Sequence, residues 1–177
     1  MGKCFSVNDG FCIFAMYVIN NVKSYKEISM FNEFTPDRIT ELKPNEIFVF
    51  GSNLAGLHGG GAARVAYERF GAIWGKGVGM QGRSYAIPTM QGGVETIKPY
   101  VNEFREFALK HQEYKFLVTR IGCGIAGFTP EEIAPLFTSA IELNNVVLPK
   151  DFVKVIHEKN KWIDSFDYWA DRNVEHF

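Results

Sequence analysis

The sequence predicts an α/β fold, a three-layer α/β/α sandwich with a mixed, largely parallel sheet. Two observations lead to this prediction. Short apolar segments with strand character alternate with longer segments whose apolar residues follow helical spacing. Two glycine-rich loops, 51–61 and 122–128, each follow a predicted strand. Ligands bind beyond the carboxyl ends of strands in such sheets, so we expect both loops at one edge, facing one ligand.

The predicted elements follow one another closely along the chain. The strand 47–50 is short, apolar and aromatic, as a covered central strand should be, and Gly51 ends it. Three consecutive glycines then open a helix over 62–70. Thr129 before Pro130 predicts a helix start with a threonine N-cap. The remaining predictions are strands at 83–87, 114–121 and 152–156, helices at 94–110 and from 129 to about 143, and a flexible loop at 73–82.

Length and composition indicate one globular domain with a sizeable core. The chain has 177 residues, of which 46% are hydrophobic and 22% are charged. We expect the α/β domain over residues 35–158. An N-terminal extension, 1–34, would form an edge strand or a short helix. The tail, 159–177, would pack on the domain.

Charge and cysteine content narrow the possible partners. A net charge of -1 gives no global basic field, so nucleic acid is not an expected partner. Cys4, Cys12 and Cys123 form neither a disulfide framework nor a Cys-x-x-Cys pair. Neither the cysteines nor the acidic and histidine residues have metal-site spacing, so no metal or other cofactor is expected. No apolar run is long enough to span a membrane, and we expect a cytoplasmic location.

Side chains in or beside the glycine-rich loops could carry chemistry, and each has an alternative interpretation. Asn53 could bind a ribose hydroxyl or position a water, or it could form an Asx turn. His58 could act as a general acid or base, or it could be an exposed loop residue without a mechanism. Cys123 could be a nucleophile with a lowered pKa, or a small buried spacer. Arg120 could point to a phosphate or face an ion-pair partner.

These residues, in their order and spacing, resemble the macro domain family. Asn53 follows the first core strand, the glycine run 59–61 opens a helix, and the later loop 122–128 reads Gly-Cys-Gly-Ile-Ala-Gly-Phe. The resemblance covers roughly residues 35–145. It implies that the chain binds ADP-ribose or a related nucleotide, with the first loop near the distal ribose and the second loop on the diphosphate. Asp37 stands near the place of the aspartate that recognises adenine in that family.

The chain also departs from the family pattern at several positions. Arg38 interrupts the Asp-Ile-Thr segment after Asp37, Cys123 replaces a serine or threonine, and Ala126 replaces an aromatic residue. Ala62 stands where some members carry a catalytic acid. The resemblance therefore implies binding more directly than hydrolysis of an ADP-ribosyl or phosphoester bond. It indicates a divergent bacterial or phage branch of the family.

The predicted site combines both glycine-rich loops. We expect Asn53 and His58 to be catalytic, orienting a water at the distal ribose. Ligand contacts are expected from Asp37, Gly51, Ser52, Asn53, Gly59, Gly60, Gly61, Gly122, Cys123, Gly124, Ile125, Ala126, Gly127 and Phe128. Two other functions remain open. One is a Rossmann-like nucleotide phosphoribohydrolase, whose first strand turn is loosely similar to residues 48–52. The other is a non-catalytic interaction module in which the glycine loops are only structural.

Overall fold

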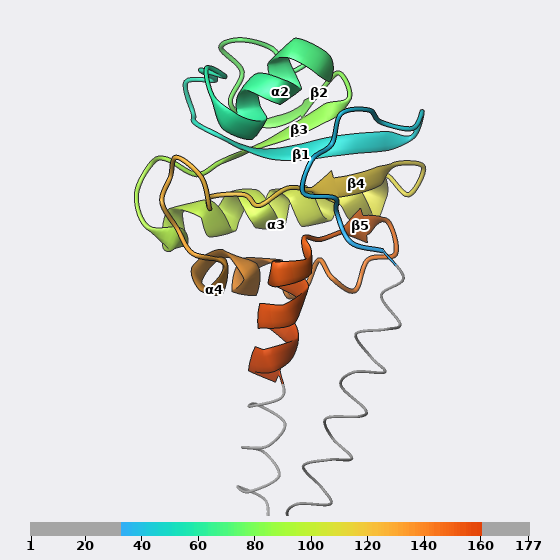
Figure 1. Cartoon of the computed structure of the whole chain (residues 1–177), viewed down its shortest axis with the longest axis vertical. Coiled ribbons are helices and arrows are strands. Elements are labelled where there is room, and N and C mark those ends of the chain that lie inside the picture. Colours follow the sequence, from blue (N-terminus) through green and yellow to red (C-terminus); the bar gives the residue numbers. More distant parts are fainter. Residues whose placement is uncertain (1–32, 161–177) are drawn as a thin grey trace, which may run out of the picture. The chain divides into compact units, whose positions relative to one another are not determined.

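The computed structural model describes residues 33–160, which form an α/β sandwich (Figure 1). A five-stranded, mixed and mostly parallel sheet is combined with helices, and this confirms the predicted fold class. The N-terminal extension expected at 1–34 and the packed tail expected at 159–177 lie almost wholly outside the described residues.

The sheet is built around one central buried strand. β1 (Glu46–Ser52) lies between β3 (Ser84–Pro88) and β4 (Lys115–Val118), and both neighbours run parallel to it. The strand order is β2-β3-β1-β4-β5. β2 (Gly79–Gln81) is antiparallel to β3, and β5 (Val146–Val147) is parallel to β4. The carboxyl ends of four strands therefore share one edge of the sheet.

The helices connect these strands in chain order. α2 (Gly61–Arg69) follows β1, and α3 (Val94–Lys110) follows β3 over the predicted residues. α4 (Pro130–Ile133) follows the second glycine-rich loop and continues into the 3-10 helix η1 (Ala134–Phe137). A further helical segment begins at residue 150 and continues to the end of the described chain.

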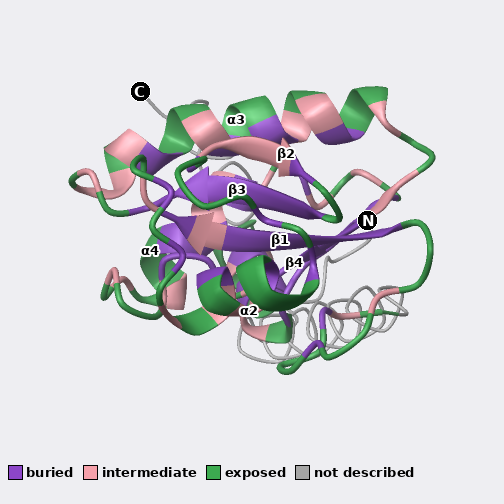
Figure 2. Cartoon of the chain, turned by 90° about the horizontal axis from the view of Figure 1, so that it is seen from above, coloured by how far each residue is buried: buried purple, intermediate pink, exposed green. Residues whose placement is uncertain are grey.

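One face of the sheet packs against α2. The rings of Phe48 and Phe70 lie 4.9 Å apart, and Phe50 stacks beside Phe48. Ala63 and Ala66 bring the helix backbone close to these rings. Figure 2 shows the buried strands at the centre of the domain and the exposed outer surface of α2.

The opposite face packs against α3 and the later helices. Phe104 of α3 is fully buried, and its ring contacts Tyr85 of β3 at 5.2 Å and Phe116 of β4 at 5.5 Å. Phe137 lies 6.4 Å from Phe104 and packs in turn on Phe152. Because both faces are covered, β1 is a continuous apolar run and not an alternating one.

The predicted strand at 152–156 is wrong, because this segment is helical. Phe152, Val153 and Ile156 are buried on one side, at the i, i+1 and i+4 positions that a helix brings together. Pro149 precedes the helix, and the fifth strand lies earlier, at Val146–Val147. A five-residue apolar window is too short to separate the side-chain period of a strand from that of a helix.

The helix predicted from residue 129 begins as expected but ends earlier. Thr129 and Glu132 form a capping box, and Pro130 occupies the first turn. The α-helix stops at Ile133 because Pro135 has no amide hydrogen to continue the ladder. The predicted loop 73–82 contains the short strand β2, which makes the sheet mixed.

Candidate functional site

A pocket of about 120 Å³ opens at the carboxyl edge of β1, β3 and β4. Both glycine-rich loops line it, as expected from their position after two neighbouring parallel strands. The residues that line the pocket are Gly51, Ser52, Asn53, Leu57, Gly60, Gly61, Ala62, Ala63, Thr89, Met90, Thr119, Arg120, Ile121, Gly122, Gly124, Ile125 and Ala126.

The floor of the pocket is backbone from both loops. A Cβ on Gly51 would lie 3.4 Å from the amide nitrogen of Gly122 and 3.5 Å from Oγ1 of Thr89. Gly122 has φ +76, a conformation that favours glycine, and a Cβ there would meet Ile133 at 3.1 Å and Phe128 at 3.3 Å. The end of β1 and the second loop therefore meet at the pocket floor, where position 122 is the one that requires glycine.

The amino end of α2 forms one side of the pocket. The first hydrogen bond of the helix runs from the Arg64 amide to the Gly60 carbonyl, at 3.1 Å. The amides of residues 61–63 precede this bond, so they have no partner within the helix. Gly60 is the N-cap and has no side chain to satisfy them. These amides carry the partial positive charge of a helix N-terminus beside the pocket.

The second glycine-rich loop provides another set of free amides. The Phe128 amide donates to the Gly122 carbonyl at 3.1 Å, and the Gly127 amide donates to the Gly124 carbonyl at 3.0 Å. These bonds hold the loop, whereas the amides of residues 124–126 have no acceptor among the described residues. Successive free amides of this kind form a concavity suited to an anion.

The hydroxyl groups around the pocket already donate to the protein backbone. The Thr119 hydroxyl donates to the Val49 carbonyl at 2.9 Å, and the Thr89 hydroxyl donates to the Ser52 carbonyl at 3.3 Å. The Ser52 hydroxyl donates to the Gly77 carbonyl. An anion in the pocket would therefore receive its neutral hydrogen bonds from backbone amides and not from hydroxyls.

Arg120 is the only charged side chain among the residues that line the pocket. It lies just beyond β4, and its Nε forms an ion pair with Oδ2 of Asp151 at 2.8 Å. Both interpretations of Arg120 from the sequence thus remain compatible with its position. It has an ion-pair partner, and it lies at the pocket.

Asn53 lines the pocket, but its side chain also closes the first loop. Its Nδ2 donates to the Leu57 carbonyl at 2.9 Å, and its Oδ1 accepts from the Leu57 amide at 3.0 Å. These two bonds correspond to the loop-forming role that the sequence left open for Asn53. They leave the second Nδ2 hydrogen and a second Oδ1 lone pair for other partners.

His58 lies apart from the pocket, contrary to the position that a catalytic role requires. Its side chain is 1% exposed, and Nε2 lies 3.1 Å from the carbonyls of both Ile73 and Lys76. Because both neighbours accept hydrogen bonds, Nε2 is the protonated ring nitrogen. The ring also packs edge-on against Phe50. This placement corrects the prediction: His58 holds the 73–76 segment, and its ring is not presented to a ligand.

Cys123 belongs to the second loop but is not among the residues that line the pocket. Its Sγ lies 3.6 Å from the Ile121 carbonyl. Burial raises the pKa of the Cys123 thiol to about 11, and the nearby Arg120 only partly opposes this effect. A protonated thiol is a poor nucleophile, so these features favour the spacer interpretation over the nucleophilic one.

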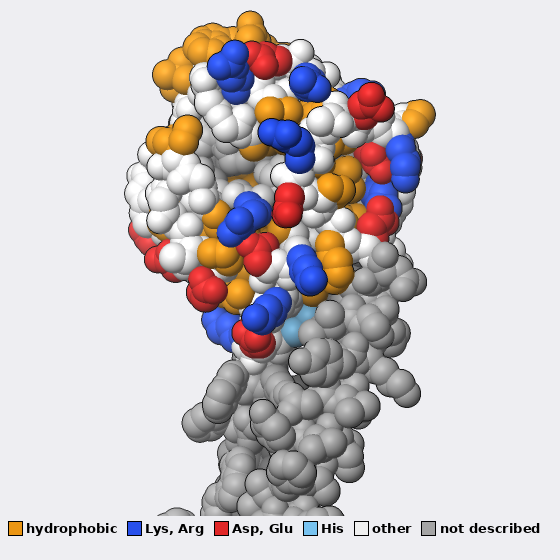
Figure 3. Space-filling model, in the orientation of Figure 1, with side chains coloured by type: hydrophobic (Ala, Val, Ile, Leu, Met, Phe, Trp, Pro, Cys, Tyr) orange, Lys and Arg blue, Asp and Glu red, His pale blue; other side chains and the backbone are white. Residues whose placement is uncertain are grey.

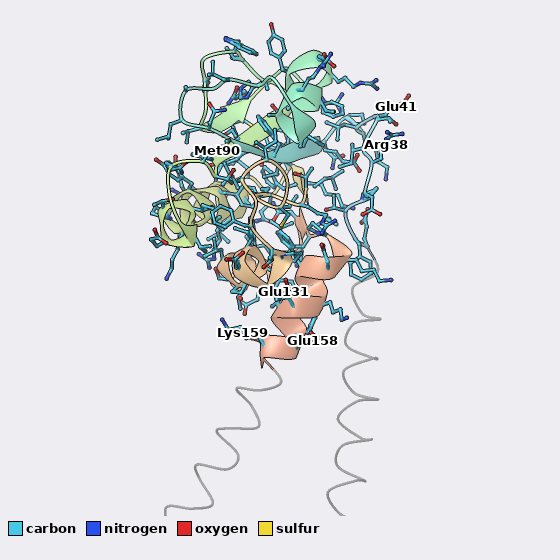
Figure 4. All side chains as sticks on the ribbon, turned by 60° about the vertical axis from the view of Figure 1, so that its left-hand side comes forward. Arg38, Glu41, Met90, Glu131, Glu158 and Lys159 are labelled. Carbon is cyan, nitrogen blue, oxygen red and sulfur yellow. The ribbon has the colours of Figure 1, made fainter. Side chains whose placement is uncertain are left out.

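Four other predicted ligand contacts lie outside the pocket lining. Gly59, Gly127 and Phe128 belong to the loops but do not line the cavity. Asp37 is exposed in the segment before β1. Its neighbour Arg38 lies on the opposite side of the molecule from Met90, which lines the pocket (Figure 4). The predicted adenine contact is therefore not brought to this pocket.

Several lining residues were not predicted from the sequence. Thr89 and Met90 follow β3, and Leu57 belongs to the first loop. The sequence offered one signal for residues 89 and 90. A Pro-Thr pair ends the predicted strand at 83–87, and the end of a strand that runs parallel to β1 reaches the same edge of the sheet. Met90, Leu57 and Ile125 are exposed and give the pocket an apolar rim.

The glycine-rich segment 75–82 packs closely against the first loop. A Cβ on Gly77 would lie 2.0 Å from the Asn53 carbonyl oxygen, and one on Gly56 would lie 2.2 Å from the Lys76 amide nitrogen. The Gly75 amide donates to the Gly56 carbonyl at 3.0 Å. The two segments are thus interlocked at distances that only glycine allows.

A second hollow of the described surface is lined by residues 40–42, Arg69, Phe70 and Arg83. On the face drawn in Figure 3, basic and acidic side chains are interspersed. Within residues 33–160, no three His, Cys, Asp or Glu side chains are grouped to hold a metal ion. None of the described helices has the length and apolar character needed to cross a membrane. Comparison with protein family models, curated proteins and solved structures gives no match for this chain.

Proposed function

We propose that the chain binds ADP-ribose or a related nucleotide diphosphate at the pocket between the two glycine-rich loops. The observation that carries this proposal is the pair of free amide sets. Residues 61–63 at the start of α2 and residues 124–126 in the second loop line the same cavity. Two sets of donors match the two phosphates of a diphosphate, which has many acceptor oxygens and no donors.

The size of the cavity supports partial enclosure of such a ligand. Its volume of about 120 Å³ is below the ~300 to 1,000 Å³ that is usual for pockets that enclose a whole small molecule. We expect the diphosphate and the adjoining ribose to occupy the cavity. The base would lie at or beyond the rim, where Leu57, Met90 and Ile125 offer apolar contacts. An enclosed adenine contact by Asp37 is not part of this arrangement.

The composition of the lining favours binding without hydrolysis. No carboxylate, histidine or cysteine is among the residues that line the pocket. General acid–base catalysis requires such a group within hydrogen-bond reach of the ligand, and a serine or threonine nucleophile requires one as its activating base. Asn53 can hold a water or a ribose hydroxyl, but it cannot accept a proton at neutral pH. We therefore propose a binding role in which catalysis by Asn53 and His58 is absent.

Calorimetric titration of the full chain tests both parts of this proposal. ADP-ribose should bind with a dissociation constant in the micromolar range, about -8 kcal/mol, and should raise the melting temperature. Adenosine, which lacks phosphate, should bind at least tenfold more weakly. Chromatography after prolonged incubation should recover intact ADP-ribose. Absence of binding at millimolar ADP-ribose would overturn the proposal, and release of a product would overturn its non-catalytic part.

A further inference from the structure

The second hollow lies at the opposite edge of the sheet from the pocket between the glycine-rich loops. Arg83, which lines it, immediately precedes β3, whereas Met90 of the pocket follows the same strand. Figure 4 shows Glu41 of the hollow and Met90 of the pocket on opposite sides of the molecule. The hollow has a volume of about 430 Å³, within the ~300 to 1,000 Å³ that is usual for small-molecule sites. It is therefore a separate place where a small ligand could bind.

Three charged side chains line this hollow, and none of them has an ion-pair partner within residues 33–160. Two are positive, Arg69 and Arg83, and one is negative, Glu41. An Nη2 hydrogen of Arg83 is donated to the Lys43 carbonyl, which anchors the guanidinium and leaves its other N–H groups free. The Arg69 side chain has no hydrogen-bond partner in the described part of the chain. All three charges thus remain available to a ligand.

The rest of the lining adds polar and apolar groups around these charges. Arg69 lies in the last turn of α2, where the final carbonyls of the helix carry partial negative charge. The Thr40 hydroxyl has no acceptor among the described residues. Leu42 packs against the core and supplies apolar surface. A ligand that fits the hollow should therefore combine two negative groups, one positive group and a short apolar stem.

We propose that this hollow binds an acidic amino acid, aspartate or glutamate. Its two carboxylates and one ammonium are the complement of two guanidinium groups and one carboxylate. Arg69 and Arg83 each bind one carboxylate through paired N–H donors, and Glu41 binds the ammonium beside the carboxyl end of α2. A phosphate group fits less well, because Glu41 would repel it and would gain no partner. This inference does not rest on the function proposed for the other pocket.

Calorimetric titration of the full chain with L-aspartate and L-glutamate tests the inference. At least one of them should bind with a dissociation constant of about 1 mM or below. The dicarboxylate of the same length, succinate or glutarate, lacks the ammonium, and asparagine or glutamine lacks the second carboxylate. Each of these should bind at least about fivefold more weakly than the matching acidic amino acid. No binding of either acidic amino acid at roughly 10 mM, or equal affinity for the matching dicarboxylate, would overturn the inference.

The variant Glu41→Gln separates recognition of the ammonium from loss of folding. It removes the attraction for the ammonium and also the repulsion of the carboxylates. Binding of the acidic amino acid should weaken, while binding of the matching dicarboxylate should strengthen, so that the preference between the two ligands is lost or reversed. A general loss of structure would instead weaken both ligands together. A preference that is unchanged in Glu41→Gln would contradict the proposed role of Glu41 and overturn the inference.

Two arginines of α2 provide a matched pair of variants. Arg69→Gln should weaken binding of the acidic amino acid at least about fivefold. Arg64→Gln is the control, because Arg64 is also exposed but is paired with Glu68 and does not line the hollow. It should bind like the wild type, and equal losses in both variants would overturn the inference. Arg69→Gln should leave the affinity for ADP-ribose unchanged, so failure at this hollow is distinguishable from failure of the proposed function.

Discussion

Gly51 and Gly122 meet at the floor of the pocket, where a Cβ on Gly51 would lie 3.4 Å from the Gly122 amide nitrogen. One residue lies near the end of β1 and the other in the loop that follows β4. Because these strands are parallel neighbours, the two glycines reach the same edge of the sheet. The floor of the pocket is therefore built from two segments that are distant in the sequence.

The two floor glycines should differ sharply when replaced by alanine. At Gly51 the added methyl group would make ordinary contacts, so Gly51→Ala should change the free energy of unfolding by less than about 1 kcal/mol. At Gly122, φ +76 and contacts of 3.1 and 3.2 Å to Ile133 should make Gly122→Ala less stable by about 1–3 kcal/mol. Urea unfolding of both variants measures this difference, and equal losses would contradict the described floor.

Gly77→Ala should destabilise the chain more than either Gly51→Ala or Gly122→Ala. Its Cβ would lie 2.0 Å from the Asn53 carbonyl oxygen and 2.7 Å from that of Leu54, and both atoms belong to the backbone. We expect a loss of about 3 kcal/mol or more, because the interlocked segments must separate. Gly59→Ala is the control, since nothing lies within 4 Å of its Cβ position. If Gly77→Ala has the same melting temperature as Gly59→Ala, the close contact between the first loop and the segment 75–82 is contradicted.

Replacement of His58 should affect stability and not ligand affinity. His58→Phe removes the hydrogen bonds from Nε2 to the carbonyls of Ile73 and Lys76 while it keeps a ring against Phe50. The expected loss is about 1 kcal/mol in the free energy of unfolding. The dissociation constant for ADP-ribose, measured on the folded variant, should change less than about threefold. A tenfold weaker affinity in a His58→Phe variant that remains folded would show that His58 contributes to the ligand site.

The Cys123 thiol should react slowly and should weaken folding at alkaline pH. With Cys4 and Cys12 replaced by serine, Cys123 is the remaining thiol. A folded-state pKa of about 11 means that alkylation by iodoacetamide at pH 8 should proceed at roughly a hundredth of the rate in urea.

The raised pKa of the Cys123 thiol also predicts how the stability of the fold depends on pH. The unfolded thiol loses its proton near its ordinary pKa of about 8.5, whereas the folded thiol keeps its proton up to about pH 11. The stabilising contribution is therefore complete below about pH 8.5 and is lost as the pH rises toward 11. Cys123→Ser should remove this dependence. A thiol that is alkylated rapidly at pH 7 would contradict the described burial.

Strong periodicity made part of the fold predictable from the sequence. The helix at 94–110 was predicted with its observed bounds, because its buried residues repeat at helical spacing over about three turns. The strand at 47–50 was recognisable as a covered strand, although β1 extends to Ser52. The helical segment 152–156 was predicted as a strand, because five residues carry too few repeats to separate a strand from a helix.

Of the candidate site, only the two glycine-rich loops could be predicted from the sequence. Both glycine-rich loops line the pocket, which follows from their place after parallel strands. The burial of His58 and the inward contacts of Ser52 depend on the partner segment 73–77. Thr89 and Met90 reach the pocket because β3 pairs with β1. Strand order and long-range packing of this kind are not recorded in local sequence patterns.

In the function proposed for the pocket, both loops bind one phosphate-bearing ligand, and a pair of matched glycine variants tests this. Gly124 and Gly59 both have open space around the Cβ position and no positive φ, but only Gly124 lines the pocket. Calorimetric titration with ADP-ribose should show at least tenfold weaker binding for Gly124→Val, while Gly59→Val binds like the wild type. Equal affinities of the two variants, or no binding by the wild type at millimolar ADP-ribose, would contradict binding of the ligand between the two loops.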